Sequence, residues 1–254
     1  MTNLNFLQKF FLLLVMGFSL SIVCACGGDD NDEKIDIPIE EEGPVPENKP
    51  NDEPIEPSME HEWVDLGLSV KWATCNIGAS APEEYGGYFA WGEIQIKEKY
   101  GWDTYKWASG VGDSLKMTKY YTLSDYGDDP DYIRLLKKED DAASSEWGGK
   151  WRMPTKKEMN ELCDSCTWIP CEKNGIFGMQ IIGRNGNHIF LPAAGQDCGI
   201  IELGNQGKCG YYWTSERSFA YYACYLFFDK STERYKLYDY AARCDGYTIR
   251  PVME

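Results

Sequence analysis

Histidine and basic side chains are scarce in this sequence. Its 254 residues include two histidines, and 25 lysines and arginines stand against 41 aspartates and glutamates, which gives a formal net charge of −16. The HExxH zinc motif, the GxSxG nucleophile motif, the P-loop and the dinucleotide-binding glycine pattern are all missing. Since phosphate binding needs clustered Lys and Arg, the sequence predicts no nucleic-acid partner. It also predicts no enzymatic activity, no cofactor and no metal site, although a loop with four aspartates leaves a structural ion open (Asp125, Asp128, Asp129 and Asp131).

Long apolar runs are also rare, and the clearest one lies near the N-terminus. Residues 10–23 are apolar and follow one positive charge, Lys9. Fourteen residues are too few to span a bilayer core, which needs roughly 20 in a helix, whereas a basic start and a short apolar run are typical of a secretory signal. Residues 23–26 (VCAC) resemble a bacterial lipobox, so we expect residues 1–25 to be a lipoprotein signal peptide and Cys26 to be acylated. A plain signal peptide that releases a soluble protein is the alternative.

Phe, Trp and Tyr are absent from the segment that follows. Residues 26–62 contain six prolines, fourteen acidic and two basic residues, and so carry most of the net negative charge. Such a segment buries too little apolar surface to offset its ordering entropy, which predicts an acidic, proline-rich disordered tether. Acidic residues directly after a lipidated cysteine resemble the surface-export signal of Bacteroidetes lipoproteins, and a generic solvated linker is the alternative. We therefore expect a lipid-anchored protein of the outer membrane whose domain lies at the cell surface.

Residues 63–254 hold all nine tryptophans and all seventeen tyrosines, and we expect them to form one domain. Glycine is frequent and long helical periodicity is scarce, which predicts a loop-rich α+β fold of antiparallel sheets with one or two short helices. Residues 222–228, 234–240 and 247–252 are predicted strands, and residues 229–232 and 244–246 are predicted turns.

One helix is indicated in detail. Thr155 and Glu158 have the spacing of a capping box, and Pro154 stops any helix arriving from upstream. The apolar positions that follow share one helical face (Met159, Leu162, Cys163 and Cys166). Pro170 is expected to close the segment.

Eight of the ten cysteines lie in the domain, and an even number in an exported chain favours disulfides. The connectivity stays open, and our local interpretation pairs Cys198 with Cys209 and Cys224 with Cys244. Cys163 and Cys166 also have the spacing of a redox or zinc pair. Because a second matched pair and a βαβ context are missing, a structural role is favoured for them.

A set of motifs in fixed order spans the whole domain. Residues 63–76 (WVDLGLSVKWATCN) and 85–93 (YGGYFAWGE) open it, and residues 147–155 (WGGKWRMPT) lie in the middle. Three later motifs complete the set: 189–195 (IFLPAAG), 212–215 (YWTS) and 246–252 (GYTIRPV). Together they resemble the Fibrobacter succinogenes major paralogous domain family, which is common in Bacteroidetes lipoproteins. The resemblance implies a C-type-lectin-like fold, distantly similar to the formylglycine-generating enzymes, but no general activity.

The motif residues also have plain physical roles. The four motif tryptophans are expected to anchor the core (Trp72, Trp91, Trp151 and Trp213). Arg152 and Arg250 lie in apolar strings and are expected to act as buried or half-buried hydrogen-bond hubs to carboxylates or backbone carbonyls. Cys224 and Cys244 lie where formylglycine-generating enzymes carry a reactive cysteine pair, yet their flanking residues do not match that enzyme pattern.

The C-terminal third is crowded with tyrosines and arginines, side chains that favour the recognition of proteins or sugars. We predict a ligand-binding face from seven of its residues (Trp213, Arg217, Tyr221, Tyr235, Tyr238, Tyr240 and Arg243). The alternative is that the tyrosines pack into the core. The sequence thus predicts a surface-exposed lipoprotein with a lectin-like binding module for a glycan or protein ligand. A structural envelope or adhesive-appendage subunit, and an enzyme of the formylglycine-generating type, are the alternatives.

Overall fold

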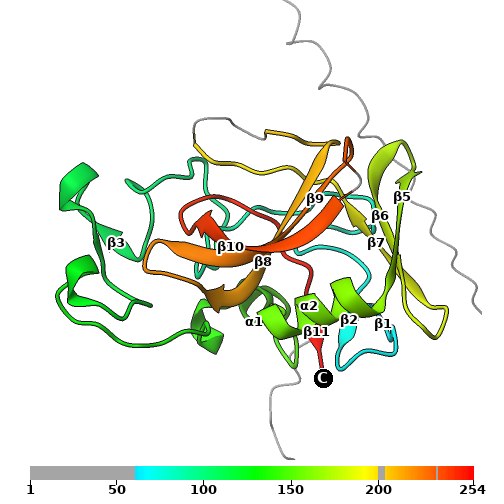
Figure 1. Cartoon of the computed structure of the whole chain (residues 1–254), viewed down its shortest axis with the longest axis horizontal. Helices are drawn as coiled ribbons and strands as arrows, with labels where there is room; N and C mark the ends of the chain where they lie inside the picture. Colours follow the sequence, from blue (N-terminus) through cyan, green and yellow to red (C-terminus); the bar gives the residue numbers. More distant parts are fainter. Residues whose placement is uncertain (1–60, 200–203, 233) are drawn as a thin grey trace, which may run out of the picture. The chain divides into compact units, whose positions relative to one another are not determined.

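Antiparallel sheets make up most of the regular structure of the domain (Figure 1). The computed structural model describes residues 61–199, 204–232 and 234–254, which belong to one compact unit. A first sheet joins β1 (Trp63–Val64), β2 (Lys71–Ala73) and β11 (Val252–Met253), so the beginning and the end of the domain meet in it. A two-stranded ribbon joins β3 (Ala108–Ser109) to β4 (Lys116–Met117).

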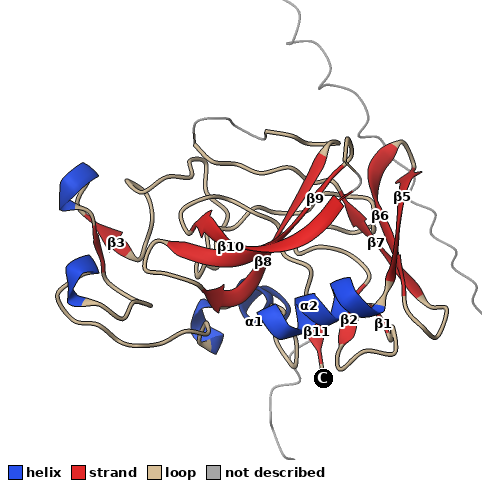
Figure 2. Cartoon of the chain, in the orientation of Figure 1, coloured by secondary structure: helices blue, strands red, loops and turns tan. Residues whose placement is uncertain are grey.

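Two larger sheets follow in the chain. One contains β5 (Thr167–Lys173), β6 (Ile176–Ile182) and β7 (His188–Pro192), and the other contains β8 (Cys209–Arg217), β9 (Tyr222–Asp229) and β10 (Arg234–Ala242), with β9 in the centre. The described helices are α1 (Ala142–Trp147), α2 (Lys156–Ser165) and three short 3₁₀ turns, Gly112–Ser114, Ser124–Tyr126 and Lys138–Asp140 (Figure 2). The predicted α+β composition is therefore confirmed.

Helix α2 begins as its capping box predicts. The Thr155 hydroxyl accepts from the Glu158 N–H at 3.2 Å, and the Glu158 carboxylate accepts from the Thr155 N–H at 2.8 Å. Met159 and Leu162 are buried on its inner face. The helix ends at Ser165, so the prediction that Pro170 closes it is wrong. Pro170 lies inside β5, an outer strand of its sheet, where proline is tolerated because its missing N–H need not pair.

The predicted hairpin of residues 222–240 is confirmed by β9 and β10, and the Asp229 carboxylate accepts from the N–H groups of Ser231 and Thr232 in its turn. The third predicted strand, residues 247–252, is wrong except for Val252. Those residues are all buried, and their backbone pairs in turn with Phe89, Trp213, Ile77 and Ala73. The segment therefore crosses the core and changes its hydrogen-bonding partner at almost every residue. A β-strand would instead pair with successive residues of one neighbouring strand.

The sheet β8–β10 divides the core because alternate side chains point to opposite faces. Tyr212, Leu226 and Phe228 pack on one face with α2, β6 and β7. Trp213 and Tyr225 pack on the other face, with the loops before β3 and after β10. All four tryptophans predicted to anchor the core are buried (Trp72, Trp91, Trp151 and Trp213), which confirms that prediction.

The two motif arginines are hydrogen-bond hubs of the fold. Arg250 is fully buried and donates to the Asn76 side chain and to three backbone carbonyls, those of Ala73, Thr74 and Phe190, at 2.8 to 3.1 Å. Burial lowers the pKa of its guanidinium to about 10, so it stays charged at neutral pH. Arg152 donates both of its terminal nitrogens to Glu158, at 2.8 and 2.7 Å. The prediction of hydrogen-bond hubs at Arg152 and Arg250 is confirmed.

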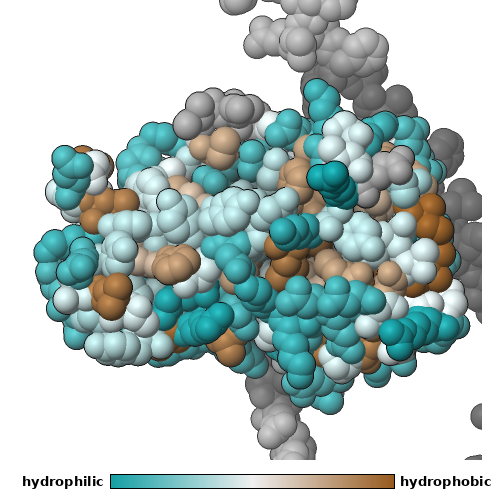
Figure 3. Space-filling model, in the orientation of Figure 1, coloured by the Kyte–Doolittle hydropathy of each residue, from teal (hydrophilic) through white to brown (hydrophobic). Residues whose placement is uncertain are grey.

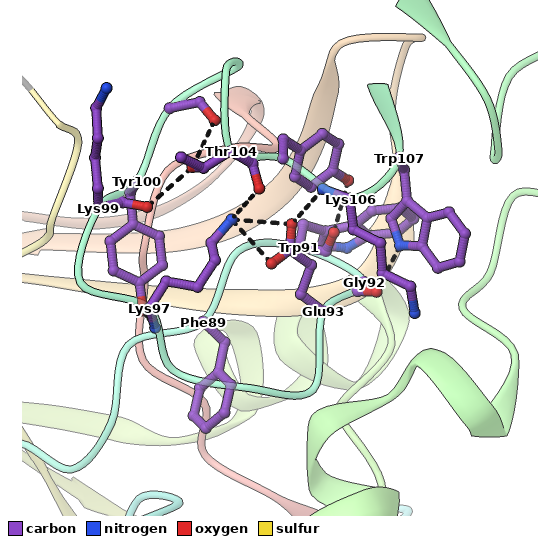
Figure 4. Close-up of polar contacts among 12 residues, drawn as sticks. Phe89, Trp91, Gly92, Glu93, Lys97, Lys99, Tyr100, Thr104, Lys106 and Trp107 are labelled. Carbon is purple, nitrogen blue, oxygen red and sulfur yellow. Dashed lines mark hydrogen bonds and ion pairs between the residues drawn. The ribbon is translucent and has the colours of Figure 1, made fainter. Parts of the chain in front are cut away.

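The motif loop that contains Trp91 and Glu93 is closed by its own polar contacts (Figure 4). The Glu93 carboxylate accepts from the Lys97 ammonium at 3.0 Å and from the Lys106 N–H at 2.7 Å. The Trp107 indole N–H donates to the Gly92 carbonyl at 2.6 Å. Gly92 has a φ of 76°, a left-handed conformation that favours glycine, so this turn explains the glycine of the motif.

The eight cysteines of the described residues are free thiols, and both predicted disulfides are wrong. Tyr222 pairs with Ala242, the last residue of β10, so Cys244 lies beyond the end of the hairpin and is not opposite Cys224. A disulfide needs Cα atoms within about 7 Å. For the other pair, the Gly195 N–H donates to the Cys209 carbonyl. Asp197 then pairs with Gly246, so the chain has turned away from Cys209 by the time it reaches Cys198.

Replacing Arg250 tests the buried hub. Arg250→Met leaves buried carbonyl oxygens without donors, each at a cost of about 1–3 kcal/mol, so we expect the free energy of unfolding to fall by roughly 3–5 kcal/mol. Arg250→Lys should recover only part of it, because an ammonium cannot reproduce the planar fork of donors. Arg184→Met, at an exposed position, is the control and should stay within about 0.5 kcal/mol. Urea unfolding followed by tryptophan fluorescence measures each value, and equal effects at the two positions would contradict the hub.

Candidate functional site

The seven residues of the predicted ligand-binding face do not share one surface. Trp213 and Arg243 are fully buried and Arg217 is nearly so, which means that none of these three can contact a ligand. The Trp213 indole donates to the Phe89 carbonyl at 2.7 Å, and the Arg217 Nε donates to the Ile133 carbonyl at 2.6 Å. The binding role predicted for them is wrong because each side chain is buried and donates to the backbone or side chains of the domain.

Arg243 is a second buried hub. Its guanidinium donates to the Tyr105 hydroxyl and to the carbonyls of Lys119, Tyr120 and Ala220, at 2.7 to 3.1 Å. It also lies 4.8 Å from the centre of the Trp91 ring, a cation–π contact. These four hydrogen bonds tie the Arg243 side chain to the loops near Tyr105 and Tyr120 and to Ala220, and this structural role replaces the predicted one.

Two of the predicted tyrosines pack away from the open face. Tyr235 is half-buried on the α2 side of the sheet, where its ring stacks on Trp168 at 4.3 Å. Tyr221 packs edge-on against Trp102 and Tyr126, and its hydroxyl donates to the Leu115 carbonyl at 3.1 Å. For these two tyrosines, packing into the fold is the correct interpretation.

Tyr238 and Tyr240 end a continuous row of aromatic rings on the other face of the β8–β10 sheet. From the inside outward, ring centres are 4.3 Å apart for Trp213 and Tyr247, 5.3 Å for Tyr247 and Tyr225, 5.6 Å for Tyr225 and Tyr238, and 5.4 Å for Tyr238 and Tyr240. Tyr211 and Phe227 join it at the side. We call these seven residues the aromatic ladder (Trp213, Tyr247, Tyr225, Tyr238, Tyr240, Tyr211 and Phe227).

Strand register produces this ladder. Across β8, β9 and β10, one row of directly paired residues is Trp213, Tyr225 and Tyr238. The next row on the same face, two residues along each strand, is Tyr211, Phe227 and Lys236. Directly paired residues of neighbouring strands project from the same face. Burial falls along the ladder, from fully buried Trp213 to Tyr240, which is 62% exposed. The ladder therefore links the core to an accessible surface.

The accessible end of the ladder is polar as well as aromatic. Tyr240 and Tyr238 carry phenol hydroxyls, and Asp239 is exposed between them. The exposed Lys236 ammonium lies 5.5 Å from the centre of the Tyr238 ring. In the hydropathy view, apolar residues form separate patches among hydrophilic ones (Figure 3). An aromatic, hydrogen-bonding surface with a charged neighbour is suited to recognition.

Five residues of the ladder and its surroundings were not among the seven predicted residues: Tyr211, Tyr225, Phe227, Lys236 and Tyr247. A signal for Tyr225 and Phe227 was present, since they alternate with buried Cys224, Leu226 and Phe228 along β9. Tyr247 lies in the C-terminal segment that crosses the core, and the alternation of residues along a strand gives no information about that path.

Comparison of the chain with protein families, with curated proteins and with solved structures found no match. The resemblance drawn from the sequence motifs therefore stays a prediction. Within the described residues, no helix has the length and apolar character to cross a membrane. In the same part of the chain, no three His, Cys, Asp or Glu side chains are grouped to hold a metal ion. In the aspartate loop, the Asp131 carboxylate instead accepts from the N–H groups of Tyr120, Tyr121 and Ile133.

Asp245 makes the inner end of the ladder sensitive to pH. Burial, followed by the charge of Asp197, raises the pKa of its carboxyl to about 6. Burial also raises the pKa of the Tyr225 and Tyr247 phenols, and the Asp245 charge adds to that rise. Because the folded-state pKa lies above the unfolded one, Asp245 favours the folded state below pH 4. That contribution is lost as the pH rises from about 4 to about 6.

Asp245→Asn should remove this penalty. At pH 7.5 we expect the variant to be more stable than the wild type by roughly 1–3 kcal/mol, and at pH 4 the difference should vanish. Urea unfolding at both pH values measures the effect, with Asp113→Asn at an exposed site as the control. A variant that is less stable than the wild type at pH 7.5 would show that the charged carboxylate is favoured in the fold.

Proposed function

We propose that the chain is a surface-exposed lipoprotein whose C-type-lectin-like domain binds a protein partner through the aromatic ladder. The observation that carries the proposal is the gradient along the ladder, from buried Trp213 to exposed Tyr240. Rigid aromatic residues supported by a core lose little entropy on binding, and tyrosines are enriched among the residues that dominate protein interfaces.

The charged surroundings of the ladder favour a protein over other ligand classes. Arg234, Lys236 and Asp239 are exposed on the same strand, β10, as Tyr238 and Tyr240. Aromatic residues beside mixed charges form the usual anatomy of a protein interface. A glycan is the competing ligand, and the binding experiment below distinguishes it.

The location is proposed from the N-terminal segment. Cys26 and the apolar run of residues 10–23 lie outside the described residues, so their support comes from the lipobox pattern. Two or more acyl chains hold a protein stably on a membrane without a spanning helix. The acidic residues after Cys26 support display at the surface of the outer membrane.

The enzyme alternative gains no support from the cysteines. Cys224 and Cys244 are separated along the β9–β10 hairpin, and both are buried. Burial raises the pKa of the Cys224 thiol to about 12 and that of Cys244 as well, whereas a catalytic cysteine needs a lowered pKa. A structural appendage subunit differs from a binding module in self-assembly, so size-exclusion chromatography of the chain separates the two.

Alanine substitutions in the ladder test the ligand-binding proposal. The full chain is screened on arrays of extracellular-matrix and envelope proteins and on a glycan array, and its best partner is measured by biolayer interferometry. We expect a protein partner, with Tyr238→Ala and Tyr240→Ala each weakening it by about tenfold or more. Tyr222→Ala, exposed on the opposite face of the sheet, is the matched control and should have little effect. Binding to glycans alone, or equal loss in all three variants, would refute the proposal.

Replacing Cys26 tests the anchor. Cys26→Ala removes the thiol that would carry the acyl chains, so we expect the protein to lose incorporated palmitate and to leave the membrane fraction. Metabolic labelling and cell fractionation measure both effects, with Cys75→Ala in the domain as the control. An unacylated wild-type N-terminus in mass spectra would rule out the lipid anchor.

A further inference from the structure

Two hollows in the surface meet at Thr74, the residue that follows strand β2. The first has a volume of 840 Å³ and is lined by Trp63, Trp147 and Trp151, among others. The second has a volume of 420 Å³ and lies over strands β6 and β7. Both volumes are in the range of about 300–1,000 Å³ that is typical of small-molecule sites. Since Thr74 lines both, we treat them as one elongated site and call it the Thr74 cleft.

The first half of the Thr74 cleft is aromatic. The rings of His61 and Trp147 stack at 3.7 Å, and Trp151 meets Trp147 edge-on at 5.0 Å. Trp63 is 45% exposed, and the Lys71 ammonium lies 4.1 Å from its ring centre. The exposed Trp63 and the half-buried Trp147 offer flat apolar surfaces to a bound molecule, whereas Trp151 is buried behind them in the fold.

The second half of the cleft is polar. It lies on the outer face of the β5–β7 sheet, since Gln180 pairs with Phe190 and Ile182 with His188, while the alternate residues Ile181 and Ile189 enter the core. The side chains of Gln180 and His188 make no hydrogen bonds within the described residues and border this half. They are polar groups available to a ligand beside the Phe190 ring.

The cleft is built on rigid parts of the fold. Arg250 lies beneath it and donates both to the Thr74 carbonyl, where the halves meet, and to the Phe190 carbonyl in the polar half. The amides of Asn185 and Asn187, in the turn between β6 and β7, donate to the Asp65 carbonyl just after β1, at 2.9 and 2.8 Å. These contacts fix the two walls relative to each other, so little ordering is needed on binding.

The charges of the cleft balance in each half. Glu62 and Lys150 line the aromatic half, and Glu172 and Lys173 line the polar half. A strongly cationic or anionic ligand would therefore find no matching excess of charge. A purely apolar ligand would leave the polar half unsatisfied. The ligand that fits both halves is neutral, elongated and rich in hydroxyl groups, with flat C–H faces for the indoles.

We infer that the Thr74 cleft is a binding site for a neutral oligosaccharide. One sugar ring stacks on the exposed face of Trp63, and the following rings pass Thr74 and hydrogen-bond with Gln180 and His188. The cleft shares no residue with the aromatic ladder, so this inference and the proposed protein partner stand or fall separately.

The test uses the full chain in detergent and a panel of neutral hexasaccharides: β-1,4-glucan, β-1,4-xylan, β-1,4-mannan, α-1,4-glucan and chitin fragments. Binding is measured by isothermal titration calorimetry and by tryptophan fluorescence. We expect at least one hexasaccharide to bind, and its monosaccharide to bind much more weakly because it reaches one half only. Trp63→Ala should weaken binding by about tenfold or more, and Gln180→Ala and His188→Ala by about fivefold each.

Two control variants make the result specific. Ile96→Ala removes an exposed apolar side chain elsewhere, and Tyr240→Ala removes the end of the aromatic ladder; both should keep oligosaccharide binding within about twofold. Thermal unfolding of each variant confirms that it folds, and the exposed His188→Ala reports on the cleft if Trp63→Ala is destabilised. The inference is overturned if no hexasaccharide binds at millimolar concentration. It is also overturned if binding survives Trp63→Ala and His188→Ala, or if Tyr240→Ala abolishes it.

Discussion

The fold depends on a positive charge buried without a carboxylate. Arg250 is enclosed by the carbonyls of Ala73, Thr74 and Phe190 and by the Asn76 side chain, which belong to segments more than a hundred residues apart. An unpaired buried guanidinium would be very costly, so these acceptors must be in place together. The first sheet, the β5–β7 sheet and the C-terminal crossing are thereby fixed to one another. Arg243 does the same for the loops near Tyr105 and Tyr120.

The β8–β10 sheet packs against a hydrophobic core on each of its two faces, and this arrangement produces the aromatic surface of the domain. Along β9, Leu226 and Phe228 pack toward α2, while Tyr225 and Phe227 point to the opposite face. The second face is covered near Trp213 by the C-terminal crossing and uncovered toward Tyr240. The aromatic surface is therefore the uncovered continuation of a core, which explains how large rings stay ordered where they meet solvent.

The sequence correctly predicted the features that depend on residues close together in the chain or on a strong preference for burial. The capping box of Thr155 and Glu158, the β9–β10 hairpin and the buried motif tryptophans are confirmed, because each depends on neighbours in the chain or on a strong preference for burial. The predictions that were wrong depend on distant contacts. The arginines at positions 217 and 243 resemble surface recognition residues in composition, and only the carbonyls of remote loops make them structural. The cysteine pairs were wrong for the same reason, since the paths of the loops that contain Cys198 and Cys244 depend on distant contacts.

The free thiols of the described residues carry a consequence for the chemistry of the folded domain. Burial raises the pKa of Cys163 and Cys224 to about 12 and that of Cys209 to about 11. Only the thiolate attacks an oxidant or a disulfide, and at pH 7 roughly one such thiol in 10⁵ is ionised when its pKa is 12. Once folded, these cysteines exchange slowly even in oxidising surroundings. Reaction of these thiols is therefore favoured while the core is open, before the domain has folded.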